Sequence, residues 1–196
     1  MSRTPTDAMN MLRAGNRRFV DGISGGQFTA ARVTASLAGQ EPWAVVVGCS
    51  DSRVPVEAVF DVGVGDLFVV RTAGHVLAEA SIASVRFAIE KLGARMVVVL
   101  GHEDCGAVGA ALSGDSPSWL APILDHIDVA HVDVNAAPAD ADAEHALLAA
   151  AVDSHVRATV RELRELVATY DIADEVSVVG TAYKLATGEV HWLDEE

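Results

Sequence analysis

Four short segments of this chain are almost entirely apolar and rich in β-branched residues, and they limit the fold more than any other feature. They are residues 43–48 (WAVVVG), 67–70 (LFVV), 96–101 (MVVVLG) and 176–180 (VSVVG). Continuous apolar strands are typical of a parallel sheet, because helices cover both of its faces. The segments therefore predict an α/β fold with a mostly parallel β-sheet core flanked by helices.

Helical patterns surround these strands. Between the second and third strands, apolar residues recur at intervals of three and four from Ile82 to Leu92, which predicts a crossover helix over residues 78–92. Further helices are predicted over residues 6–20, 118–129 and 144–170, and residues 22–39 are predicted to form a loop with one short helix. The alternating tail around Thr187-Gly188 predicts a hairpin that ends in a C-terminal edge strand.

Length and charge narrow the class of protein. A chain of 196 residues corresponds to about one domain, which we divide into an N-terminal helical arm (1–40) and an α/β core (41–196). The net charge of -14 opposes binding to nucleic acid or to an anionic membrane. The chain has neither an apolar run of the ~20 residues that span a membrane nor the apolar core of a secretory signal, which predicts a soluble cytoplasmic protein.

The chain's two cysteines each follow a predicted strand. Cys49 begins the sequence CSDSR, and Cys105 ends HEDC, which begins at His102. Because parallel strands present their carboxyl ends at one edge of the sheet, these side chains can converge there. Two cysteines and one histidine are a ligand set that zinc uses in catalytic sites, with a fourth position left for water, substrate or a carboxylate such as Asp51. Thiolates favour zinc over magnesium or calcium, although copper(I) and iron also accept them.

Other interpretations of these residues compete with the metal site. A single cysteine at a strand end is commonly a small buried hydrophobe, and two of them can form a redox pair. Their joint occurrence with His102 favours the metal. A second site at His126, Asp128 and His131 is less favoured than a solvated helix face. The sequence assigns no role to the other histidines, which are His75, His145, His155 and His191.

Asp51 and Arg53 are separated by one residue, so in an extended segment their side chains lie on the same side and can pair. The simplest interpretation is an ordinary ion pair. Beside a metal, the pair would act as a switch, because an arginine that holds Asp51 keeps this carboxylate off the metal. The fourth position would then be open to water, from which Asp51 would accept a hydrogen bond.

Together, CSDSR at residues 49–53 and GHEDCGAV at residues 101–108 resemble the β-class carbonic anhydrases. The resemblance extends to residues 12–19 (LRAGNRRF), 68–76 (FVVRTAGHV) and 180–190 (GTAYKLATGEV). It implies the reversible hydration of carbon dioxide to bicarbonate and a proton by zinc-bound hydroxide. The implied zinc ligands are Cys49, His102 and Cys105. Asp51 and Arg53 match the family's catalytic dyad, in which the aspartate ligates zinc in a closed form and pairs with the arginine in an open form.

The resemblance also implies a substrate pocket. Gln40 matches a pocket glutamine of the plant-like branch, Phe68 matches a phenylalanine, and Phe87 stands where that branch has a tyrosine. With Val54, the two phenylalanines are expected to form an apolar site for CO2, and the Gln40 amide to hydrogen-bond an oxygen that becomes negative in the product. The other branch has a regulatory tryptophan three residues before the first zinc cysteine. Because this position is Val46 here, we expect the plant-like branch without bicarbonate regulation.

The family forms dimers and larger assemblies, with the N-terminal helix packed on a partner subunit and the pocket at the dimer interface. We therefore expect a homodimer or a higher homo-oligomer. The long apolar stripe of residues 144–170 fits this, because part of it can face another subunit. Two alternatives remain open. One is an enzyme of the same scaffold that acts on carbon disulfide or carbonyl sulfide, and the other is a non-catalytic zinc-binding or bicarbonate-binding module, against which the intact Asp51-Arg53 pair argues.

Overall fold

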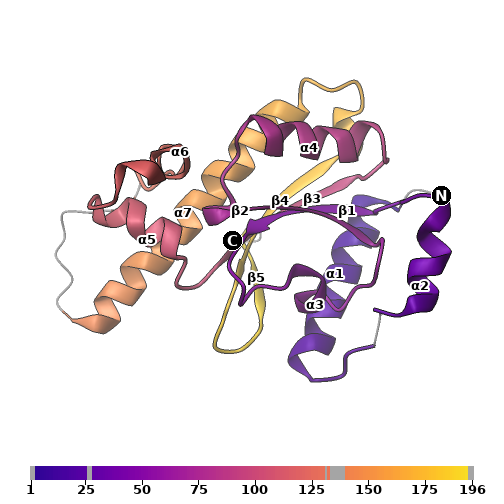
Figure 1. Ribbon diagram of the computed structural model, residues 1–196, viewed down its shortest axis with the longest axis horizontal. Coiled ribbons are helices and arrows are strands. Elements are labelled where there is room, and N and C mark those ends of the chain that lie inside the picture. Colours follow the sequence, from indigo (N-terminus) through magenta and orange to yellow (C-terminus); the bar gives the residue numbers. More distant parts are fainter. Residues whose placement is uncertain (1–2, 26–27, 131, 133–139, 194–196) are drawn as a thin grey trace.

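One five-stranded sheet forms the centre of the computed structural model, which describes residues 3–25, 28–130, 132 and 140–193 (Figure 1). The strands are β1 (Ala44–Cys49), β2 (Leu67–Thr72), β3 (Met96–His102), β4 (Ser177–Tyr183) and β5 (Val190–Trp192). They lie in the order β2-β1-β3-β4-β5. The first four pair in parallel, and β5 pairs antiparallel with β4 at the edge. The predicted α/β class and its C-terminal edge strand are confirmed.

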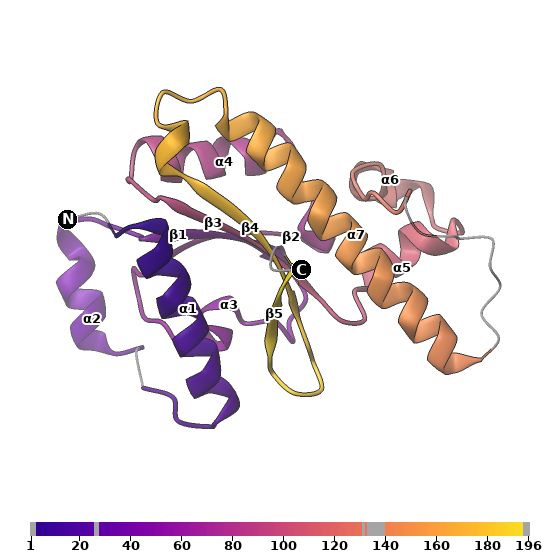
Figure 2. The same cartoon turned by 180° about the vertical axis from the view of Figure 1, so that it is seen from behind.

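Helices cover both faces of this sheet. The helices of the described chain are α1 (Pro5–Val20), α2 (Ala30–Ala35), α3 (Val56–Val59), α4 (Glu79–Glu90), α5 (Gly106–Ser113), α6 (Ala121–Leu124) and α7 (Ala141–Val167). Helices α4 and α7 lie on one face, and α1 and α3 lie on the other (Figure 1). Seen from behind, α7 runs alongside β4 (Figure 2). Among the described residues, no helix combines the length and the apolar character needed to cross a membrane.

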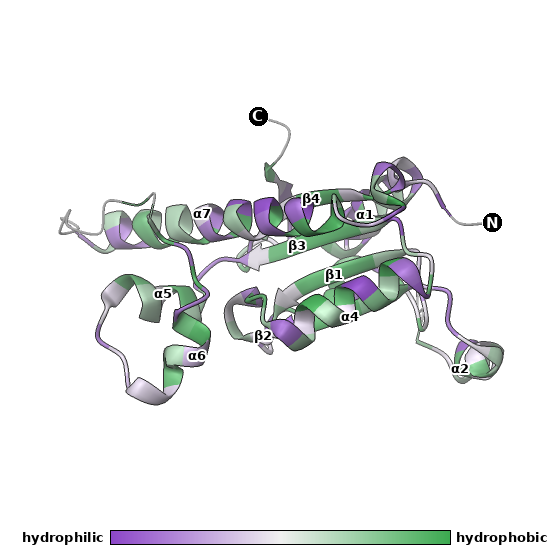
Figure 3. Cartoon of the chain, turned by 90° about the horizontal axis from the view of Figure 1, so that it is seen from above, coloured by the Kyte–Doolittle hydropathy of each residue, from purple (hydrophilic) through white to green (hydrophobic). Residues whose placement is uncertain are grey.

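The central strands β1 and β3 are buried on both faces because alternate side chains enter different cores. Val45 and Val47 of β1 pack with residues of α4 and α7, whereas Ala44 and Val46 pack with residues of α1 and α3. Every residue of β1 and β3 is buried. The hydropathy colouring agrees with this, since β1 and β3 are almost entirely apolar whereas α4 and α7 contain both apolar and polar residues (Figure 3).

The predicted helix over residues 118–129 is confirmed only in its first half. The chain forms a 3-10 turn at Ser118–Leu120 that continues into the four-residue helix α6. Pro122 fits the first turn of α6, where its missing N–H is not needed, but the helix ends at Leu124 and residues 127–129 are neither helix nor strand. The short helices α3 and α5 were not predicted, because neither has enough turns to produce a clear apolar stripe. The acidic connector at residues 132–143 falls mostly outside the described residues.

The buried side chain of Asn16 connects α1 to the C-terminal hairpin through hydrogen bonds. The Asn16 Nδ2 donates to the carbonyls of Gly188 (2.8 Å) and Val59 (3.0 Å), and its Oδ1 accepts from the N–H of Val190 (2.9 Å). The hairpin turns at Gly188, whose φ of +79° is in the left-handed region that favours glycine. Thus α1 packs on its own subunit, and its predicted contact with a partner stays a prediction.

Candidate metal centre

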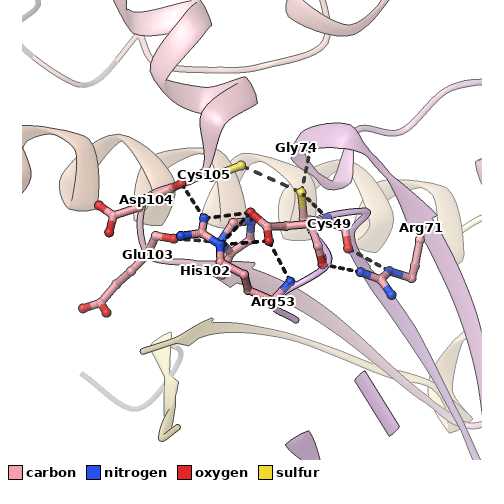
Figure 4. A network of polar contacts seen from close by, with 9 residues as sticks. Cys49, Arg53, Arg71, Gly74, His102, Glu103, Asp104 and Cys105 are labelled. Atoms are coloured by element: carbon pink, nitrogen blue, oxygen red, sulfur yellow. Dashed lines mark hydrogen bonds and ion pairs between the residues drawn. The ribbon is translucent and has the colours of Figure 1, made fainter. Parts of the chain in front are cut away.

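The sheet order brings the three predicted ligands together. Strands β1 and β3 are neighbours, so Cys49 at the end of β1 lies beside His102 at the end of β3, and Cys105 follows just before α5. One potential ligand atom from each residue lies within 4.8 Å of the others, and all three side chains are buried (Figure 4). Among the described residues, this is the group of three side chains that could hold a metal ion.

The spacing of the sulfurs fits a tetrahedral metal ion. Two thiolates bound to zinc at about 2.3 Å in a tetrahedron would lie about 3.8 Å apart. The Sγ atoms of Cys49 and Cys105 are 3.9 Å apart. This distance leaves the two cysteines as free thiols rather than a disulfide. The donor set therefore fits a tetrahedral metal without rearrangement of the two sulfurs.

The imidazole of His102 is oriented for a metal by its own backbone. Its Nδ1 lies 2.7 Å from the carbonyl oxygen of Glu103, and because that oxygen can only accept, Nδ1 carries the hydrogen. The lone pair is then on Nε2, which is buried and has no hydrogen-bond partner among the described residues. A buried nitrogen in this state costs free energy unless a ligand satisfies it. A metal ion would do so.

Negative charge collects at this site. A hydrogen bond from the Cys105 thiol is the main reason that the pKa of Cys49 is lowered to about 4, although burial acts to raise it. The backbone N–H groups of Asp51 (3.4 Å) and Gly74 (3.3 Å) also donate to the Cys49 sulfur and lower its pKa. The neighbouring Cys49 in turn raises the pKa of Cys105. Burial lowers the pKa of His102, but the sulfur of Cys49 raises it above its usual value on balance. Such a centre attracts a cation.

Arg53 forms an ion pair and hydrogen bonds with Asp51 beside the three ligands. Its Nε lies 3.0 Å from Oδ1 and its Nη2 lies 2.8 Å from Oδ2, and its N–H donates to Oδ1 at 2.9 Å. These bonds lower the pKa of Asp51 to about 2. The Nη2 of Arg53 also donates to the carbonyl of Asp104 (3.2 Å), so the pair is tied to the ligand loop. Asp51 Oδ2 is 3.9 Å from His102 Nε2, within easy reach of a bound metal.

Arg71 is a further residue of the site that the sequence reasoning did not single out. It donates from Nε to the carbonyl of Cys49 (2.8 Å) and from Nη2 to the carbonyl of Asp51 (2.6 Å). These bonds hold the backbone of the segment that carries both side chains (Figure 4). The available signal was its position directly after the second predicted strand, residues 67–70, where an arginine follows the apolar run.

The predicted pocket residues divide into two places. Val54 is buried near the site, and its N–H donates to the carbonyl of Asp51 (3.1 Å). Phe68 pairs with Val45 in the first half of β1. Val45 is four residues before Cys49, so at 3.3 Å per residue this pair lies roughly 13 Å from Cys49 along the strand. Phe87 belongs to the last turn of α4, with its ring centroid 6.3 Å from that of Phe68.

Gln40 precedes β1 and therefore also lies at the end of that strand opposite to Cys49. Within a single chain, Gln40, Phe68 and Phe87 therefore lie at the other end of β1 from the metal ligands. The second metal site suggested by His126 and Asp128 also lacks support, since neither joins a metal-ligating group among the described residues. His131, the third member of that set, lies outside the described residues.

A parallel α/β sheet with two cysteines and a histidine at the carboxyl ends of adjacent strands defines a candidate metalloenzyme. Comparison with known proteins narrows this class. Residues 44–190 match the family model described as carbonic anhydrase, and the chain belongs to the β-class carbonic anhydrase family.

Named relatives agree with this assignment. The chain is 38% identical to a carbonic anhydrase of Mycolicibacterium smegmatis, over 95% of this chain and 92% of the relative. It is 49% identical to carbonic anhydrase 2 of Mycobacterium tuberculosis over 117 residues, which span 59% of this chain and 56% of that protein. The match therefore covers little more than half of the M. tuberculosis protein.

Solved structures share the fold. A β-carbonic anhydrase of Aspergillus fumigatus aligns with a TM-score of 0.73 and 25% identity, covering 92% of this chain and 88% of that one. A structure described as tetrameric, from Sordaria macrospora, aligns with a TM-score of 0.69 and 24% identity over 96% of this chain and 94% of its own.

Proposed function

We propose that this protein is a zinc-dependent carbonic anhydrase that catalyses the reversible hydration of carbon dioxide to bicarbonate and a proton. The observation that carries the proposal is the buried Cys49-His102-Cys105 group, with its sulfurs 3.9 Å apart, beside a carboxylate held by an arginine. Bound there, zinc supplies a Lewis acid that lowers the pKa of a water molecule and so provides a nucleophile near neutral pH.

Asp51 and Arg53 have separate tasks in this proposal. Asp51 stays ionised because of its lowered pKa, so one of its oxygens accepts a hydrogen bond from the attacking water and aims the water's lone pair at the carbon of CO2. Arg53 holds both oxygens of Asp51 and keeps the carboxylate away from the fourth metal position. Val54 stays a proposed pocket residue through its position beside Asp51, whose carbonyl accepts its N–H, although its side chain is fully buried in the core that includes α1 and α3.

The remaining pocket residues are proposed to act across a subunit interface. Gln40, Phe68 and Phe87 lie at the end of β1 and β2 away from the ligands, β2 is an edge strand, and the Phe87 side chain is 48% exposed. In a homodimer or higher homo-oligomer, they would line the pocket of the neighbouring subunit. Sedimentation velocity tests this arrangement: a fully active monomer would contradict it.

A cytoplasmic location and the absence of bicarbonate regulation belong to the same proposal. A reducing compartment keeps Cys49 and Cys105 available as thiols, in agreement with their unbridged state. The plant-like interpretation rests on Val46, which is buried in β1. Bicarbonate would then inhibit the enzyme only as a product that competes at the metal centre, without the sigmoidal loss of activity that a second binding site produces.

Stopped-flow measurement of CO2 hydration, with zinc content determined on the same sample, tests the function directly. We expect rapid hydration by the zinc-loaded protein and none by the protein stripped with a chelator. Zinc retention without CO2 hydration would contradict the proposal. Assays with carbon disulfide and carbonyl sulfide would then separate a related enzyme from a non-catalytic binding module.

A further inference from the structure

A hydrogen-bonded connection runs from α7 to the sulfur of Cys49. Gly74, in the 3-10 turn Ala73–His75 that follows β2, donates its N–H to Cys49 Sγ at 3.3 Å (Figure 4). The carbonyl oxygen of the same glycine lies 2.9 Å from Nε2 of His155. His155 is only 2% exposed and belongs to α7, more than 100 residues after Cys49. One glycine therefore joins a buried histidine to a metal-ligating sulfur.

The direction of each hydrogen bond follows from the groups involved. The N–H of Asp128 points at Nδ1 of His155 at 3.2 Å, and a backbone N–H can only donate. Nδ1 therefore carries no hydrogen in the neutral ring, and Nε2–H donates to the carbonyl of Gly74. Burial lowers the pKa of His155, which favours this neutral ring.

The turn at residues 73–75 has a backbone conformation that few residues adopt. Gly74 has a φ of +66° and His75 a φ of +46°, both in the left-handed region. A Cβ on Gly74 would lie 3.0 Å from Cδ1 of Ile127 and 3.2 Å from Cβ of Ala107, so only glycine fits without displacement of its neighbours. His155 also stacks on the ring of His75, with centroids 4.4 Å apart. It therefore contacts both left-handed residues of the turn.

We propose that His155 is a positioning residue of the metal centre, which holds the 73–75 turn so that the Gly74 N–H remains directed at Cys49 Sγ. Hydrogen bonds to a ligating sulfur reduce its electron donation, and partners of this kind orient ligands and tune the metal they hold. His155 acts through Gly74 and does not touch the metal. The inference rests on the proposed metal site, but it does not depend on the substrate.

The competing interpretation is that His155 merely fills the core between α7 and the sheet. Three variants separate the two roles. His155→Leu removes both ring nitrogens, whereas His155→Gln retains an amide that can donate to the Gly74 carbonyl. Val160→Ala is the control for lost stability, because Val160 is a buried residue of the same helix that packs against Gly180 rather than Gly74.

The readouts are the affinity for zinc, from competition with a chelator, and the sulfur-to-metal charge-transfer band of the cobalt(II)-loaded protein. For His155→Leu, we expect zinc binding weakened by about 10- to 100-fold and a charge-transfer band at lower energy, because the sulfur loses a hydrogen bond. His155→Gln should lie nearer to the wild type in both readouts. Val160→Ala should match the wild type in both despite a lower Tm. An unshifted band in His155→Leu would overturn the proposal.

A measurement on the unaltered protein keeps the proposal testable if His155→Leu does not fold. Nitrogen-15 NMR of the zinc-loaded wild type should show a neutral His155 with its hydrogen on Nε2, and a hydrogen on Nδ1 would overturn the proposal. The outcomes also separate this inference from the proposed function. A wild type that binds zinc and has the expected tautomer but does not hydrate CO2 refutes the function alone, whereas failure of the wild type to bind zinc or cobalt refutes the metal centre itself.

Discussion

Arg53 holds both carboxylate oxygens of Asp51, through Nε to Oδ1 at 3.0 Å and Nη2 to Oδ2 at 2.8 Å. The pair lies beside the Cys49-His102-Cys105 group, with Oδ2 of Asp51 3.9 Å from Nε2 of His102. In the proposed mechanism, this arrangement leaves one coordination position to water. The guanidinium thus fixes an acceptor for that water and prevents the acceptor from becoming a ligand.

Replacing Asp51 with asparagine should suppress turnover while zinc is retained. The amide keeps the shape of the side chain but loses the negative charge that pairs with Arg53, and only one of its two terminal atoms can still accept a hydrogen bond from water. We expect kcat to fall by about 100-fold or more, the scale of a positioned acid-base group. Stopped-flow hydration, with zinc measured on each sample, provides the check. Unchanged activity would remove Asp51 from the mechanism.

The hydration rate should rise from neutral toward alkaline pH. Two thiolates donate more charge to zinc than two imidazoles would, so the nucleophilic water should lose its proton at a higher pH than in a three-histidine site. Asp51, with a pKa of about 2, is already ionised and contributes nothing to this rise. The check is a pH-rate profile at constant ionic strength. A flat profile from mildly acidic to alkaline pH would contradict the prediction.

The stability of the folded protein should decrease as the pH falls below about 6.5, which is the usual pKa of a histidine in an unfolded chain. The reason is that His75 and His155 are buried in the folded protein, and burial lowers their pKa values. Below this pH these two histidines bind more protons in the unfolded chain than in the folded one, so they make the free energy of unfolding rise with pH up to about 6.5 and add nothing further above it. Urea unfolding between about pH 5.5 and 8 measures the slope. His75→Phe, which keeps a ring against His155, should have a shallower slope, and an equal slope would exclude His75 as a contributor.

Asn16→Ala should destabilise the fold by about 2–4 kcal/mol, because it leaves buried backbone groups of Val59, Gly188 and Val190 without their partner. Asn10 offers a matched control, since it is the same residue type on the same helix but exposed. Urea unfolding of both alanine variants should show a loss for Asn16→Ala only. Equal stability of the two variants would mean that α1 is not fastened through Asn16.

Removal of zinc should lower the stability of the folded protein. A ligand that binds only the folded state stabilises it by about 4 kcal/mol when its concentration is a thousand times its Kd. We expect a chelator to lower Tm, zinc to restore it, and Cys105→Ser to show a much smaller response to either. A Tm that is independent of zinc in the wild type would indicate that the Cys49-His102-Cys105 group does not bind this metal.

Much of the fold was predictable because its signals are local. The apolar runs that become β1 and β3 and the helical period of α4 can be recognised from consecutive residues, and the predicted bounds differ from the observed ones by only a few residues. The prediction held only partly at residues 118–129, where the helical turns end at Leu124. It also missed α5, whose alanines and glycines have no clear apolar face.

The amino-acid sequence alone determined the parallel sheet, the candidate ligands Cys49, His102 and Cys105, and the pairing of Asp51 with Arg53, because each depends on strand character or on residues close together in the chain. Only the tertiary structure decided that β1 and β3 are neighbours, which places the sulfurs 3.9 Å apart. It also placed Arg71, Gly74 and His155 around Cys49. These contacts use backbone groups, which every residue carries, and they join segments separated by up to about a hundred residues, so no local pattern could reveal them.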